Sequence, residues 1–216
     1  LFLNFKYGSI TAFNLETQGF SLSTLPYHFF RATGLGNFIL FTNPVRPTFD
    51  FTFFPIMYSD TWGDYWAYFS VDLDSNNADV MRSYLGFINL IAVLPTFLII
   101  VSFFGIVSEI FNNWKHNLNT PENSFKLLLI LVFFFTMVGF LWFVISYPET
   151  TNGDTVKATY VIQALIALPL ITGFYWGNKL KQKKVLFIVF AIFYLIVFSL
   201  SFKAYLTTYV IPLVPI

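Results

Sequence analysis

The sequence LLLILVFFFTMVGFLWFVISY, residues 127–147, contains no charged residue. The hydrocarbon core of a bilayer is about 30 Å thick and takes about 20 helical residues to cross, so this stretch predicts a helix that spans a membrane. The composition of the whole chain agrees, since 56% of its 216 residues are hydrophobic and 11% are charged. A soluble domain needs roughly 25% charged residues to cover its surface. We therefore expect an all-α integral membrane protein.

Four stretches after residue 82 are long and apolar enough to cross a bilayer. Pro95 lies inside the first of them and predicts a kink, because proline cannot donate a helical hydrogen bond. Asn89 and Gln163 are expected to hydrogen-bond between helices. The cores of the last three stretches carry no ionisable side chain, which disfavours an ion-coupled transporter. The four predicted spans are 84–108, 127–147, 158–176 and 185–202.

The sequence GNKLKQKK, residues 177–184, sets the expected orientation in the membrane. Loops rich in lysine normally stay in the cytoplasm, and this loop holds four lysines: Lys179, Lys181, Lys183 and Lys184. Alternation of the spans then places residues 1–82 outside. The chain is thus divided into an extracytoplasmic, aromatic-rich segment at the membrane interface, residues 1–82, and a transmembrane helical domain, residues 83–216. The expected location is the cell membrane, with several passes.

The sequence YSDTWGDYWAYF, residues 58–69, combines two aspartates with six aromatic rings. Asp60, or the serine before it, is a good N-cap for a predicted helix at residues 61–69. Trp62 would begin a stripe of rings at helical spacing, which suits the headgroup level of the membrane. Asp60 and Asp64 would share the opposite face and point toward water or toward a cleft between the spans.

Two carboxylates as close as Asp60 and Asp64 have several uses. They can hold a divalent cation, raise each other's pKa, or bind the hydroxyl groups of a polar substrate. The alternative is structural, since aromatic stripes usually pack and surface aspartates usually solvate a face. Gly63 costs up to about 1 kcal/mol inside a short helix, and so indicates a close backbone approach or a local break. Together with Trp62, the two aspartates form a candidate substrate-binding site. A divalent metal ion bound by the two carboxylates remains an alternative.

Upstream, His28, Arg31 and Arg46 lie on the same expected side of the membrane. Arginine binds a phosphate with two parallel hydrogen bonds, which suits a lipid phosphate or pyrophosphate at the outer surface. The alternative is that these arginines pair with nearby aspartates or with ordinary headgroups. His28 fits a structural hydrogen bond better than a catalytic role. The three residues complete the candidate substrate-binding set, and no catalytic residue is assigned.

Several classes of function are set aside by composition and motif. The net charge of +1 gives no basic patch for nucleic acid. Without cysteine there is no disulfide framework, thiolate metal site or cysteine nucleophile. Neither an HExxH zinc motif nor a GxSxG elbow is present.

Three motifs carry a resemblance to a known family: KYGSITAFN (6–14), GLGNFILFTNPVRPTFDFTFFPIMYSDTWGDYWAYF (34–69) and YLGFINLIAVLPT (84–96). Together they resemble the C-terminal half of polytopic membrane glycosyltransferases of the GT-C type, the family 39 or ArnT-like proteins. The resemblance covers roughly residues 1–110, and YSDTWGDYW is its most specific part.

The resemblance implies transfer of a sugar from a polyprenyl-phosphate donor to an acceptor on the outer face of the membrane. The catalytic aspartate of such enzymes usually lies in the first external loop, and nothing in this chain matches that loop. The resemblance thus implies a fragment without the catalytic base. It leaves substrate-binding or structural roles for Asp60, Asp64, Arg31 and Arg46.

Two other functions stay open. A non-enzymatic membrane subunit or assembly factor would use residues 1–82 as a docking surface. A transporter would need its pathway in another part of the protein. The chain begins at Leu1 without a methionine or a secretory signal, so we expect it to be part of a longer protein.

Overall fold

The computed structural model describes residues 29–30, 39–44, 52–63, 78–112, 120–146, 156–180 and 183–206. These residues are almost entirely helical and contain no strand. The elements are α3 (Ile39–Thr42), α5 (Phe53–Trp62), α6 (Ala78–Ile91), α7 (Val93–Asn112), α9 (Pro121–Ser146), the 3-10 helix η2 (Ala158–Val161), α10 (Ile162–Leu180) and α11 (Lys184–Leu206).

Among the described residues, three helices are long and apolar enough to cross a membrane: Val93–Asn112, Pro121–Ser146 and Ala158–Gly177. They support the membrane class, and they overlap the first three predicted spans. The fourth predicted span falls on α11, whose apolar part Lys184–Leu200 is shorter than the other three. A fourth crossing therefore stays a prediction.

The first predicted span, residues 84–108, is divided between α6 and α7 at Ala92. The Ala92 amide still donates to the Ile88 carbonyl at 2.9 Å, and the Thr96 amide donates to the Ala92 carbonyl at 3.0 Å. Pro95 has no N–H for the carbonyl of Ile91, so one helical hydrogen bond is missing between them. The helix is therefore interrupted one turn before Pro95, near the place where the sequence predicted a kink.

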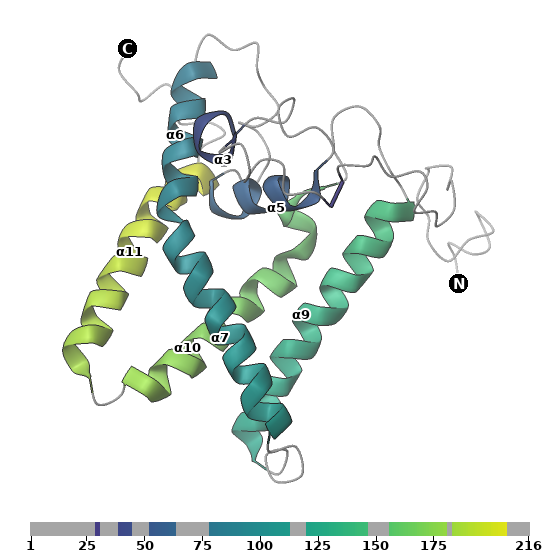
Figure 1. Ribbon diagram of the computed structural model, residues 1–216, viewed down its shortest axis with the longest axis vertical. Coiled ribbons are helices and arrows are strands. Elements are labelled where there is room, and N and C mark those ends of the chain that lie inside the picture. The colour runs from purple at the N-terminus through teal and green to yellow at the C-terminus, as the bar shows by residue number, and fades with distance from the viewer. Residues whose placement is uncertain are drawn as a thin grey trace.

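The long helices alternate in direction (Figure 1). Helix α7 runs away from α5, α9 returns toward it, α10 runs away again and α11 returns. Helices α3 and α5 lie beside α6 at one end of the molecule, which we call the α5 end. The junctions between α7 and α9 and between α10 and α11 lie at the other end, which we call the lysine end because it carries Lys179, Lys183 and Lys184.

The described residues form two core clusters, one near each end. At the α5 end, the buried residues of α5, α9 and α10 include Phe53, Ile56, Phe140, Val144 and Ala164. Toward the lysine end, α7, α9 and α10 bury Ile106, Ile110, Leu129, Ala167 and Ile171 against one another. Many other large apolar side chains are exposed, as expected for helices that face lipid.

Two glycines allow unusually close packing. A Cβ atom on Gly86 of α6 would lie 2.3 Å from the Phe41 carbonyl oxygen of α3. A Cβ atom on Gly105 of α7 would lie 2.2 Å from the ring of Tyr175 on α10. The absence of a side chain at these positions thus sets the distance between the paired helices.

The contact at Gly86 predicts that Gly86→Ala destabilises the protein. The new methyl group meets backbone, which cannot rotate away, so we expect a loss of about 1–3 kcal/mol, measured as a lower melting temperature in detergent. Gly139→Ala on α9 is the matched control, because nothing lies within 4 Å of its added Cβ. Equal melting temperatures for the two variants would contradict the close approach of α3 to α6.

Candidate functional site

Helix α5 carries the most specific sequence motif of the chain. Thr52 precedes it with extended backbone angles, φ −112° and ψ 125°. Pro55 is tolerated because it lies in the first turn, where amide groups have no partner inside the helix. The helix ends at Trp62, and the Gly63 amide donates to the Ser59 carbonyl at 2.8 Å.

The predicted start of the helix at residue 61 is wrong. Asp60 is not an N-cap but lies in the last turn of α5, and its residue is only 1% exposed. The reason is the apolar run before it: Phe53, Ile56 and Met57 are buried, and Asp60 follows them at helical spacing on the same face. The Asp60 side chain therefore lies inside the protein rather than toward water.

The other predicted site residues are only partly covered by the structure. Trp62 is half-buried at the end of α5, and Gly63 forms the local break that its position indicated. Asp64, Arg31, Arg46 and His28 lie outside the described residues. Within the described ranges, no group of three or more histidine, aspartate or glutamate side chains could hold a metal ion.

A buried amide holds α5 in place. The Asn89 side chain on α6 donates from Nδ2 to the Leu40 carbonyl of α3 at 2.8 Å, and to the Ser59 hydroxyl of α5 at 3.1 Å. The Tyr58 hydroxyl of α5 donates to the Asn89 carbonyl at 2.7 Å. Asn89 thus hydrogen-bonds between helices, as the sequence predicted, and joins three segments beside Asp60.

Burial also widens the pH range in which the Tyr58 phenol stays neutral. Desolvation raises the pKa of its phenol to about 12, from an ordinary value of 10.0, because the charged phenolate is disfavoured in an apolar environment. The phenol therefore stays neutral and keeps donating to Asn89 throughout the physiological range. Its contribution to folding is complete below pH 10 and is lost as the pH rises toward 12.

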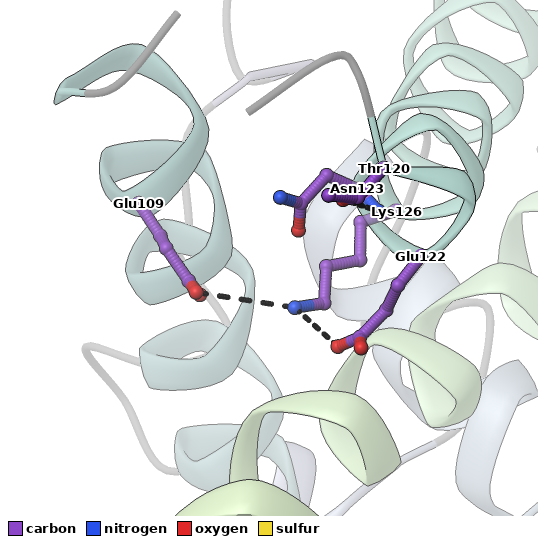
Figure 2. A network of polar contacts seen from close by, with 5 residues as sticks. All are labelled: Glu109, Thr120, Glu122, Asn123 and Lys126. Carbon is purple, nitrogen blue, oxygen red and sulfur yellow. Dashed lines mark hydrogen bonds and ion pairs between the residues drawn. The ribbon is translucent and has the colours of Figure 1, made fainter. Parts of the chain in front are cut away.

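A second polar cluster lies at the junction between α7 and α9 (Figure 2). Lys126 of α9 has a side chain that is 3% exposed, and its Nζ lies 2.8 Å from Glu122 and 3.9 Å from Glu109 of α7. The same nitrogen lies 5.9 Å from the centre of the Phe174 ring on α10. Lys126 therefore contacts three helices.

The start of α9 positions this cluster. The Ser124 amide donates to the Thr120 carbonyl at 3.0 Å, and the Asn123 amide lies 3.4 Å from the Thr120 hydroxyl. Pro121 occupies the first helical position, where its missing N–H has no cost. Glu122 and Lys126 then follow one turn apart, with the acid nearer the N-terminus, which is the favourable order. Lys126 was not predicted as a site residue, although a lone lysine just before an uncharged span is a visible signal in the sequence.

The two clusters differ in what they can do chemically. Lys126 is a buried cation with acidic partners, which is the arrangement of a structural ion pair between helices. Asp60 is a buried carboxylate on a short helix at the α5 end, and it follows Ser59, whose hydroxyl accepts from Asn89. A carboxylate there can accept hydrogen bonds from the hydroxyl groups of a substrate. The α5 end is thus the candidate functional site.

The Lys126 cluster predicts an unequal response to charge removal. Replacing both acids (Glu109→Gln with Glu122→Gln) leaves a buried ammonium group, and we expect a loss of about 3–5 kcal/mol in stability. Lys126→Met keeps the buried aliphatic chain and leaves two carboxylates whose side chains are 51% and 53% exposed, so its cost should be much smaller. Thermal unfolding in detergent measures both variants, and a larger loss for Lys126→Met would contradict this reading.

Comparison with known proteins gave no match: no family model, no curated protein and no solved structure is significantly similar to this chain.

Proposed function

We propose that this chain is part of a membrane glycosyltransferase that moves a sugar from a polyprenyl-phosphate donor to an acceptor on the outer face of the membrane. The proposal rests on the resemblance of its motifs to GT-C type transferases and on a membrane-spanning helical fold. The donor and the acceptor would meet at the α5 end. In this proposal the catalytic base lies outside this chain, and the chain contributes to substrate binding.

The observation that carries the proposal is the position of Asp60. Its carboxylate is 1% exposed and belongs to the motif YSDTWGDYW, which is the most specific part of the resemblance. Burying a carboxylate is costly, so its place in this motif favours a role beyond solubility. A sugar offers several hydroxyl donors, and a carboxylate accepts such hydrogen bonds strongly because it is charged.

A second function is favoured by the surroundings of Asp60. It shares a helix face with Phe53 and Ile56, which belong to the apolar cluster at the α5 end, and Asn89 holds the same helix in place. These are the surroundings of a structural carboxylate. They fit a non-enzymatic membrane subunit or assembly factor, in which α5 would stabilise a docking surface.

The two functions are separated by Asp60→Asn in the full-length protein. This change keeps the shape of the side chain and removes its charge, so the transferase proposal predicts a drop of about 100-fold in sugar transfer from a polyprenyl-phosphate donor. Ser59→Ala is the control, because it alters the adjacent buried hydrogen bond without touching the carboxylate. Full transfer activity in Asp60→Asn, with a lowered melting temperature, would instead favour the structural role.

The proposal also requires the α5 end to face the outside. The chain has no native cysteine, so single cysteines report their side directly. We expect a membrane-impermeant maleimide to label Lys157→Cys, near the α5 end, and not Lys183→Cys, at the lysine end, in intact cells. A permeant maleimide should label both. Labelling of Lys183→Cys alone by the impermeant reagent would place the α5 end in the cytoplasm and remove the basis for an outer-face transferase.

A further inference from the structure

An open groove of about 340 Å³ lies between α10 and α11 at the lysine end. It is lined by Gly177 and Leu180 of α10 and by Lys184, Phe187 and Ile188 of α11. Four of these five residues are apolar or lack a side chain, and the fifth is a lysine at the start of α11. The groove thus combines an apolar wall with a positive charge at one end.

Contacts near each of its ends join α11 to the other helices, and the groove lies before the first of these contacts. Near the lysine end, the Trp176 ring stacks on Phe190 with 5.7 Å between ring centres. Near the α5 end, the Tyr84 hydroxyl donates to the Leu200 carbonyl at 2.8 Å. Before the stacked ring pair, the start of α11 exposes large apolar side chains, with Val185 at 77%. Nothing lies within 4 Å of a Cβ added to Gly177, so α10 also leaves room there.

Positive charge is concentrated at the mouth of the groove. Lys183 and Lys184 are exposed, and the Lys183 amide donates to the Leu180 carbonyl at 2.8 Å, which holds this residue close to the end of α10. The first turn of α11 also presents backbone N–H groups and the positive end of the helix dipole. Lys179 is turned to a different partner, because its Nζ contacts the Tyr175 hydroxyl at 2.6 Å.

We propose that this groove binds an anionic phospholipid of the leaflet at the lysine end. The phosphate would lie against Lys183, Lys184 and the first turn of α11, and an acyl chain would lie along Phe187, Ile188 and Leu180. The charge at the mouth favours an anionic headgroup over a purely apolar occupant, and the exposed apolar wall favours a lipid over a soluble anion. The proposal does not depend on sugar transfer, because the groove lies at the opposite end from Asp60.

The test compares lipids retained by the full chain in nanodiscs that contain equal amounts of phosphatidylglycerol and phosphatidylcholine. Native mass spectrometry after transfer to detergent counts the lipids that stay bound. We expect phosphatidylglycerol to be retained over phosphatidylcholine. Lys183→Gln and Lys184→Gln should each reduce this preference about fivefold, and Gly177→Trp should abolish retention by filling the groove.

Matched controls come from the same chain. Lys157→Gln removes a lysine near the α5 end, and Gly139→Trp adds the same ring at another open glycine, so both should retain phosphatidylglycerol as the unaltered protein does. A melting-temperature measurement checks that Gly177→Trp is folded. The two lysine variants test the site without adding bulk to the groove.

Three outcomes would overturn the proposal. Equal retention of the two phospholipids would show that the lysines select no headgroup. Loss of retention in Gly139→Trp as well as Gly177→Trp would show that the lipid is not in this groove. A change of oligomeric state in Gly177→Trp, with phosphatidylglycerol still retained, would show that a second protein helix occupies it.

Discussion

The hydrogen bonds of the Asn89 side chain determine the geometry of the α5 end. One amide group joins the backbone of α3 to a hydroxyl of α5, from a position inside α6. In a site that excludes water, these bonds are stronger than in solvent, and breaking one leaves a buried polar group without a partner. Helix α5 is therefore held across the end of the long helices, and Asp60 is held inside with it.

The opposite end is held by charge. Lys126 connects α7 and α9 through acidic partners and lies over a ring of α10. The two glutamates are half-exposed, so water can solvate them if the lysine is removed. The lysine nitrogen is buried, so water cannot solvate it if the glutamates are removed. The three apolar helices are thus joined by polar contacts at this end, whereas at the α5 end α9 and α10 pack against α5 through apolar side chains.

Much of this architecture was predictable from the sequence, because lipid imposes a simple rule: a helix that crosses a bilayer must be apolar along its length. Three predicted spans and the interhelical role of Asn89 follow from that rule. The start of α5 did not, because the N-cap preference of Ser59 and Asp60 competed with the burial of Phe53, Ile56 and Met57, and burial was stronger. Local capping preference says nothing about which face a tertiary neighbour covers. The roles of Asp64, Arg31, Arg46 and His28 stay predictions, since they lie outside the described residues.

The interruption at Ala92 has a structural consequence. Pro95 cannot donate to the Ile91 carbonyl, and the Asn89 backbone carbonyl accepts the Tyr58 hydroxyl of α5 at 2.7 Å. The cap formed by α3, α5 and α6 therefore joins the first long apolar helix through a turn rather than through one continuous helix.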